Sequence, residues 1–389
     1  MSPEELGAVA LSMTFVTFTT QVIMGGLQAG IGRYFSIAKK SKELDAYFLA
    51  VKKIMLTVVF FIFSAGLVTI LILYYLDFDF FTISIATLFL AISSCYNSTF
   101  NNIMNVARKR FTSSFFLNID IWLKITIIIL ISNFWIVTEE SVLISYALSA
   151  TIVLLLYVLH GKLTKIKCKN ESVAYKRMSK QIWRYAIPFF PWTILVWMQQ
   201  ASEKWFLQMF TSLSDVGIYA VLYMLGFAPV LMAFSIVIKF FHPVMYDSTT
   251  VNKGGVSVNL KTLLIIRIII ISGVLVSFAS FLFVDIFHAN IFQLLVSEEY
   301  WPHSVLLKWF VLSGVLFGTA EILLMKIQND MKVKVLSVAK SITGITGIII
   351  NFIGVYIAGL NGLIGALVIF SVINLLILIY ADKYSAPTN

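Results

Sequence analysis

Seven lysines and arginines lie inside long apolar segments of this chain, where a charged side chain is costly. They are Lys124, Lys204, Lys239, Arg267, Lys308, Lys326 and Lys340. A cation at the centre of a bilayer costs about 2.5–3.5 kcal/mol on insertion scales. A cation kept there either pairs with a carboxylate or offers charge-assisted hydrogen bonds to an anion such as a phosphate. These residues are therefore the first candidates for a binding site.

The position of each cation within its segment narrows this set. Lys239, Lys326 and Lys340 lie near segment ends, where a long side chain reaches the polar headgroups. Lys308 is also close to an end, and Arg267 either reaches the headgroups or lines a cavity.

Lys124 lies near the middle of its segment, and Asp120 precedes it by one helical turn. The two side chains either form a structural pair that neutralises itself, or form a cavity site. Such a site would offer a cation to a diphosphate, or a proton-sensitive carboxylate to an ion gradient.

Three further charged positions are candidates for a substrate path. Glu203 and Lys204 are neighbours that point roughly 100° apart on a helix, so they do not simply neutralise each other. They contribute either to a substrate path or to an interfacial anchor. Glu321 lies deep in its segment and is either protonated or paired with a cation on a neighbouring helix. Arg33 lies at the inner end of the first segment, 8–32. It is either an ordinary anchor at the headgroups or an arginine that binds a substrate phosphate through two hydrogen bonds.

One apolar segment carries a polar stripe with helical spacing. Its members are Ser94, Asn97, Ser98, Asn101 and Asn102. The stripe either joins helices by hydrogen bonds or forms the wet wall of a cavity that binds sugar hydroxyls. Pro188 and Pro191 predict a break or kink at the start of another segment.

No pattern in the sequence indicates an enzyme, a metal site or a cofactor. The four histidines have no metal-ligand spacing and no cysteine pair accompanies them. Nucleophile and nucleotide-binding motifs are absent from the sequence. The net charge of +10 does not indicate nucleic-acid binding, because the cations flank apolar segments, where anionic membrane lipids attract them.

The composition requires a membrane-embedded helical fold. The chain is 59% hydrophobic and 12% charged, whereas soluble domains carry about 25% charged residues. A spanning helix needs about 20 apolar residues. The sequence therefore predicts an all-α, polytopic transmembrane bundle of about eleven helices, at residues 8–32, 54–76, 82–105, 113–134, 141–160, 185–209, 217–241, 262–284, 304–327, 335–357 and 362–381.

The remaining lysines and arginines alternate from loop to loop. All but seven of the 29 follow the odd-numbered segments or lie in the tail, and the other connections hold none. The positive-inside rule then predicts a multi-pass membrane protein with a cytoplasmic C-terminus and an N-terminus that starts outside.

The longest basic connection, 161–184, predicts a division into an N-terminal bundle (1–160) and a C-terminal bundle (185–389). A short repeat supports this division: Glu5-Leu6-Gly7 recurs as Asp215-Val216-Gly217 at the start of a long apolar segment in the second half. In the second half a full segment precedes the motif. The repeat and the charge alternation therefore both predict one more helix upstream of Met1.

Several motifs resemble those of polysaccharide (O-antigen, Wzx-type) flippases of the multidrug/oligosaccharidyl-lipid/polysaccharide exporter superfamily. They are Ser2–Gly7, Gln28-Ala29, Arg33-Tyr34, Arg184–Pro188, Glu203-Lys204, Ser297–Tyr300, Asn351–Gly354 and Gly359–Ala366. The resemblance covers the whole chain. It implies two six-helix bundles around a central cavity, with the first helix of the family pattern missing.

The resemblance implies a flippase that moves an isoprenoid-diphosphate-linked oligosaccharide across the inner membrane by alternating access, for O-antigen or capsule synthesis. Membrane lipids, a polysaccharide polymerase and chain-length machinery are the implied partners. Two alternatives stay open. One is a small-molecule or drug exporter of the same superfamily. The other is a membrane polysaccharide polymerase, which would be expected to place arginines or histidines in a large outer loop, whereas the outer loops here hold no lysine or arginine.

Overall fold

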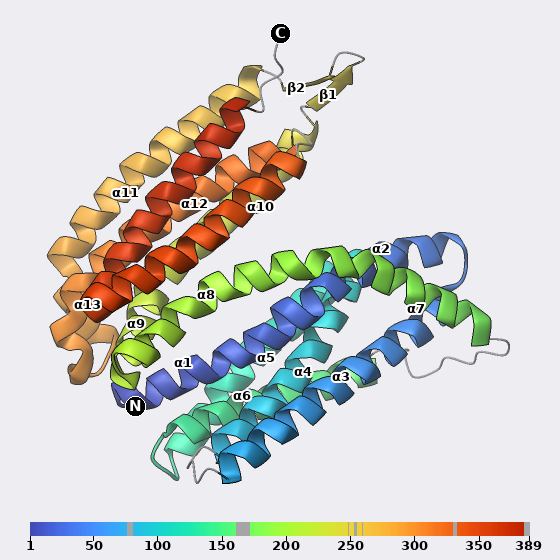
Figure 1. Cartoon of the computed structure of the whole chain (residues 1–389), viewed down its shortest axis with the longest axis horizontal. Coiled ribbons are helices and arrows are strands. Elements are labelled where there is room, and N and C mark those ends of the chain that lie inside the picture. The colour runs from blue at the N-terminus through green and yellow to red at the C-terminus, as the bar shows by residue number, and fades with distance from the viewer. Residues whose placement is uncertain are drawn as a thin grey trace. The chain divides into compact units, whose positions relative to one another are not determined.

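A computed structural model describes residues 1–75, 81–160, 172–247, 249–252, 255–258, 260–329 and 333–384. Nearly all of these residues are helical (Figure 1). Packing divides the chain into two compact units. The first is Ala8–Trp197 with Met1, and the second is Met198–Asn389 with Ser2–Gly7.

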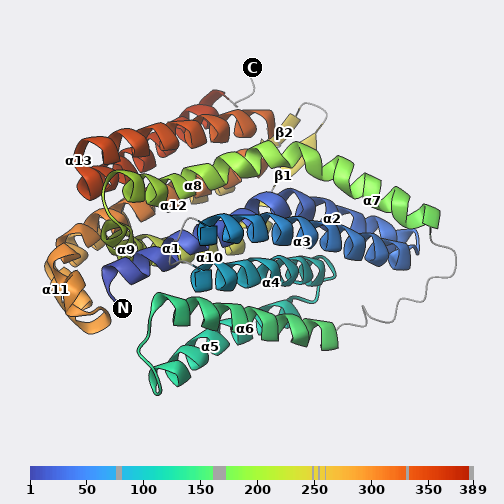
Figure 2. The same ribbon diagram turned by 60° about the horizontal axis from the view of Figure 1, so that its bottom comes forward.

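The first unit is a helical bundle in which α4 packs against both α3 and α6, and α2 packs against α7 (Figure 2). Its core includes the fully buried side chains of Met24, Leu27, Ile31 and Tyr47. The elements in chain order are α1 (Pro3–Thr17), η1 (Phe18–Ile23), α2 (Met24–Lys40), α3 (Leu44–Tyr75), α4 (Phe81–Val106), α5 (Arg110–Ser132), α6 (Glu139–His160), α7 (Ser172–Ala186), η3 (Ile187–Phe189) and α8 (Phe190–Phe210), which continues into the second unit.

The second unit is also helical, and α12 packs against α10, α11 and α13. A short antiparallel hairpin, in which Thr249 pairs with Val258, joins α10 to α11. Apart from this hairpin, the described chain confirms the all-α bundle. The elements are α9 (Leu213–Leu222), η4 (Tyr223–Phe227), α10 (Ala228–Asp247), β1 (Thr249–Asn252), β2 (Gly255–Val258), α11 (Leu260–Leu295), η5 (Glu298–Leu306), α12 (Leu307–Asn329) and α13 (Val333–Tyr384).

The eleven predicted apolar segments are helical wherever the structure describes them. Eight of the described helices are long and apolar enough to cross a membrane. One of these, Val338–Asp382, covers most of the predicted segment 335–357 and all of 362–381, and α13 breaks between the two at Ala358 and Gly359. Gly359 has a φ of 55°, which a side chain would disfavour. The break therefore occurs inside the glycine motif noted in the sequence.

The basic connection predicted at 161–184 is not a loop throughout. Residues 161–171 lie outside the described part, and α7 occupies the rest. Met178, Ile182 and Ala186 recur every fourth residue and are buried in the core of the first unit. The many lysines and arginines on the exposed face masked this amphipathic period. The predicted boundaries 1–160, 161–184 and 185–389 stay predictions, and the two compact units meet along the chain at Trp197, within α8.

The proline-rich start of the predicted segment 185–209 changes helix type without ending it. Pro188 lies in the three-residue 3₁₀ turn η3, between α7 and α8. Proline has no backbone N–H to donate, which suits the first positions of a helix. The predicted interruption is therefore a local change of winding between two helices.

The repeated acidic–apolar–glycine motif forms a reciprocal contact in the second unit. A Cβ atom at Gly7 would overlap the carbonyl oxygen of Leu213, and a Cβ atom at Gly217 would overlap the carbonyl oxygen of Pro3. Each glycine thus faces the residue that lies four positions before the other glycine. The first turn of α1 and the start of α9 cross with their backbones in contact, which glycine alone permits. The sequence repeat is a structural repeat at this point.

The two helices that begin with this motif also share an irregularity, a π-helical segment in each, η1 and η4. In η1 the hydroxyls of Thr19 and Thr20 both donate to the carbonyl of Val16, at 2.8 and 3.0 Å. Threonines that bond back to the preceding turn commonly bend helices. Short π segments within α-helices are often found at functional sites.

Candidate functional site

Lys124 and Asp120 form the ion pair that one sequence interpretation predicted. The Nζ of Lys124 lies 2.6 Å from Oδ2 of Asp120 on α5. Ser149 of α6 donates to the other carboxylate oxygen at 2.7 Å, and the ring of Tyr146 lies 5.3 Å from the ammonium. Both charges are therefore satisfied locally, as a structural pair requires. Their role in a cavity stays a prediction.

Two more intramembrane cations are paired in the second unit. Lys340 of α13 lies 2.6 Å from Glu321 of α12, so the deep carboxylate does find a cation on a neighbouring helix. Lys308 lies 2.6 Å from Asp285 of α11. Snorkelling alone therefore does not account for Lys340. The side chains of Lys239, Arg267 and Lys326 lie outside the described part of the structure.

Lys204 differs from these three lysines. It is half-buried on α8 and lies next to Glu203, yet among the described residues no carboxylate lies within 4 Å of its Nζ and no aromatic ring lies under it. Lys204 lies in the predicted apolar segment 185–209, although α8 is not among the eight described helices that are long and apolar enough to cross a membrane. An ammonium without an ion pair keeps its N–H donors for another partner. Such a group is a functional candidate by default.

Glu203 points into the second unit and is engaged there. Its side chain is 6% exposed, and its Oε2 accepts a hydrogen bond of 2.5 Å from the hydroxyl of Tyr219 on α9. The adjacent Ser202 accepts a hydrogen bond of 3.1 Å from Asn351 of α13. These groups form a buried polar cluster that ties α8 to α9 and α13. The carboxyl group and Lys204 interact electrostatically without forming an ion pair within 4 Å among the described residues, so whether the two residues contribute to a substrate path stays a prediction.

Sequence reasoning missed Tyr219 and Asn351 as members of this cluster. Asn351 opens one of the quoted motifs and Tyr219 follows another by two residues, but neither is charged, and nothing in the spacing connects them with Glu203. A usable signal was the general requirement that a buried carboxyl group has a hydrogen-bond donor.

Removing the hydroxyl of Tyr219 is expected to destabilise the second unit. Tyr219→Phe leaves the buried Glu203 without its donor, which costs about 1–3 kcal/mol. The thermal unfolding transition of the purified protein should fall. Tyr223→Phe is the matched control, because its hydroxyl has no hydrogen bond among the described residues. Equal transitions for the two variants would show that the Glu203–Tyr219 bond contributes nothing.

The polar stripe of α4 is largely used in bonds to neighbouring helices of the first unit. Asn97 donates to Ala150 of α6 at 2.8 Å. Asn102 donates to the carbonyl of Gln28 at 2.7 Å, and the side chain of Gln28 donates to Ser98 at 2.9 Å. The stripe continues with Asn101, which accepts from Ser113 of α5, and with Ser94, which is half-buried. This is the arrangement that the interhelical interpretation predicted.

Arg33 is exposed on α2, and no ion pair involving it is formed in the described part. Both of its predicted roles stay open. A group of three or more histidines, cysteines or acids suited to a metal ion is likewise not found among the described residues.

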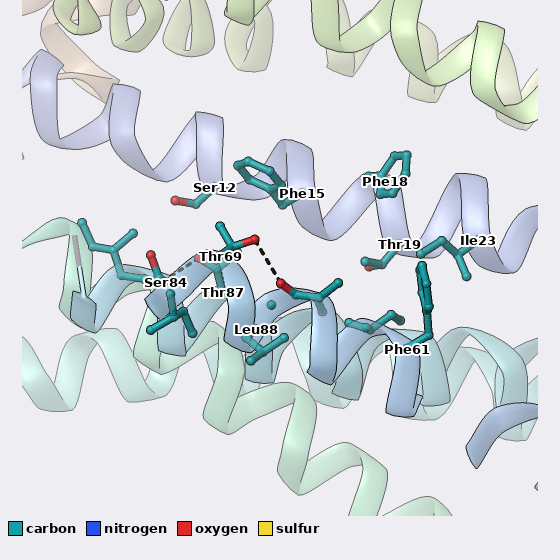
Figure 3. A pocket seen from close by; sticks show the side chains of 16 residues that line it. Ser12, Phe15, Phe18, Thr19, Ile23, Phe61, Thr69, Ser84, Thr87 and Leu88 are labelled. Carbon is teal, nitrogen blue, oxygen red and sulfur yellow. Dashed lines mark hydrogen bonds between the residues drawn. The ribbon is translucent and has the colours of Figure 1, made fainter. Parts of the chain in front are cut away.

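A cavity of about 280 Å³ lies in the first unit (Figure 3). Ser12, Phe15, Phe18 and Thr19 face it from α1 and η1, with α3 and α4 opposite. Its lining contains no charged side chain. It therefore cannot neutralise an anion, and the charged candidates lie elsewhere.

The whole described chain has the fold of known membrane transporters. A structure described as the inward-facing conformation of a multidrug resistance MATE family transporter of the MOP superfamily matches with a TM-score of 0.72 and 15% identity, over 99% of this chain and 91% of that one. The lipid II flippase MurJ, in an inward closed conformation, matches with a TM-score of 0.63 and 17% identity, over 98% of this chain and 81% of that one. The Vibrio cholerae MATE transporter VcmN, in a bent form, matches with a TM-score of 0.54 and 11% identity, over 98% of this chain and 94% of that one.

These likenesses show the fold alone, a polytopic helical bundle like those of the matched transporters. No protein-family model matches the sequence, and no curated protein matches it.

Proposed function

We propose that this protein is an inner-membrane flippase for an isoprenoid-diphosphate-linked oligosaccharide used in surface polysaccharide synthesis. The observation that carries the proposal is Lys204. The lysines at 124, 308 and 340 are each neutralised by a carboxylate at 2.6 Å, whereas Lys204 is not. A half-buried, unpaired ammonium suits a diphosphate, whose oxygens accept charge-assisted hydrogen bonds.

The buried cluster around Glu203 supports this assignment. Glu203 is the nearest acid in sequence and would otherwise compete with an anionic ligand for Lys204. Its bond to Tyr219 holds its carboxyl group in the interior of the second unit. Glu203 still attracts Lys204 electrostatically, but it forms no ion pair with it within 4 Å among the described residues, so the N–H donors of Lys204 can serve a ligand. The substrate's isoprenoid chain would stay in the bilayer. The motifs of the Wzx-type flippases and the fold shared with MurJ point in the same direction.

A drug exporter is the second candidate, and the fold match to a multidrug resistance transporter at a TM-score of 0.72 favours it. An exporter of cationic compounds would need an accessible acid. Glu203 is a buried acid, so its carboxyl group would have to break its hydrogen bond with Tyr219 before it could bind a cationic compound.

Deleting the gene separates the two candidates. The flippase proposal expects loss of surface polysaccharide and accumulation of its lipid-linked precursor, both reversed when the gene is returned, with efflux of cationic dyes unchanged. Normal polysaccharide together with reduced dye efflux would overturn the proposal and support the exporter.

A further inference from the structure

The cavity in the first unit combines an apolar wall with a position inside membrane-spanning helices. It lies between α1–η1, α3 and α4 (Figure 3), and each of these helices belongs to a candidate span. A cavity lined by apolar groups stays dry and takes apolar ligands. At about 280 Å³ it approaches the lower end of ordinary ligand sites, about 300–1,000 Å³.

Three of the five hydroxyl groups in the lining are bonded within their own helices; the other two belong to Ser12 and Ser84. Thr19 donates to Val16, Thr69 to Ala65 and Thr87 to Ile83, at 2.8, 3.0 and 2.7 Å. These three hydroxyl protons are thus used by the helices that carry them. A ligand with a charged or strongly polar group would lose its hydration without compensation, so the cavity selects a hydrocarbon.

The surroundings identify the source of that hydrocarbon. Phe15 and Phe61 line the cavity and are 51% and 62% exposed, so the cavity is not sealed by protein. Along the same helix α3, Phe60 and Leu67 are exposed as well. α3 is long and apolar enough to cross a membrane, and exposed apolar side chains along such a helix suit contact with the hydrocarbon of a bilayer.

We propose that this cavity holds part of an acyl chain of a bilayer phospholipid. The chain enters between Phe15 and Phe61 and packs against Ala65 of α3 and Thr87 of α4. It fills space beside the π-helical segment η1, which supplies Phe18 and Thr19 to the wall. The site is separate from the diphosphate site at Lys204 and does not depend on the identity of the transported substrate.

Photolabelling tests this site. The full chain is placed in nanodiscs of phospholipid that carries a diazirine in the middle of one acyl chain, irradiated and mapped by mass spectrometry. We expect adducts at Phe15 and Phe18 in excess of those at Phe60, which is 73% exposed. If the protein only contacts the bilayer and binds no acyl chain in the cavity, Phe60 should be labelled most strongly. That result, obtained with the unsubstituted protein, would overturn the proposal.

A pair of tryptophan variants on α3 provides the matched control. Ala65→Trp fills the cavity and should lower labelling at Phe15 about tenfold, because the contacts of a few buried CH₂ groups are lost. Leu67→Trp adds the same side chain outside the cavity lining and should leave that labelling unchanged. Equal labelling in both variants would overturn the proposal. So would labelling of Phe15 by a photoactivatable isoprenoid phosphate but not by the phospholipid probe.

Discussion

Lys204→Gln is expected to lower flipping of a lipid-diphosphate oligosaccharide about 100-fold. Losing a charge-assisted contact with a partly desolvated partner costs about 2–5 kcal/mol, and 1.4 kcal/mol is a factor of ten. The amount of folded protein should stay unchanged, because Lys204 has no ion pair among the described residues that its loss would break. The measurement is the initial flipping rate per folded molecule.

Two variants control for this result. Lys204→Arg keeps the charge and should retain most of the rate. Lys124→Gln removes a cation that is already paired with Asp120 at 2.6 Å, so it should affect stability more than rate. A Lys204→Gln protein that flips substrate as fast as the unmodified protein would remove Lys204 from the proposed site. If Lys124→Gln lowers the flipping rate by the same factor, the result would support the interpretation in which Lys124 and Asp120 form a cavity site.

Gly217→Ala and Gly7→Ala are each expected to destabilise the protein by about 1–3 kcal/mol, the usual cost of overpacking. Each added methyl group would overlap a backbone carbonyl oxygen, that of Pro3 or of Leu213. Backbone atoms cannot turn aside as a side chain can, so α1 and α9 must separate. Because both substitutions disturb one crossing, the double variant should lose less than the sum of the single losses. Thermal unfolding of the purified proteins measures the effect.

Gly365→Ala is the matched control for these glycines. A Cβ atom at Gly365 meets nothing within 4 Å, and alanine favours a helix over glycine by about 0.5–1 kcal/mol. This variant should therefore be neutral or slightly more stable. A shift of the same sign and size at positions 7, 217 and 365 would mean that the substitutions act only through helix propensity and that the reciprocal crossing is not tight.

Features with a strong local signal could be predicted from the sequence. Long apolar segments gave the helices, because a bilayer permits few other structures. The pairing of Lys124 with Asp120 followed from spacing on one helix. Glu321 was expected either to be protonated or to pair with a cation on a neighbouring helix, and Lys340 could not be named as that cation, because it comes from the next helix.

Features created by packing could not be predicted in this way. The bond from Tyr219 to Glu203 joins two helices, and nothing in the spacing of their residues says that these two positions face each other. The amphipathic period of α7 was hidden by its lysines and arginines, which outnumber Met178, Ile182 and Ala186. The repeat around Gly7 and Gly217 was visible, but a repeat does not reveal that its two copies touch. The cavity beside η1 depends on three helices at once and on a local change of winding.

Reconstitution of the purified chain in liposomes tests the central claim most directly. The liposomes carry a labelled isoprenoid-diphosphate oligosaccharide in both leaflets, and a membrane-impermeant enzyme outside removes the exposed sugar. The proposed function predicts that the protein makes the inner pool accessible far faster than in protein-free liposomes, and that Lys204→Gln slows this about 100-fold. Accessibility equal to that of protein-free liposomes, with a cationic dye moved by the same preparation, would contradict it.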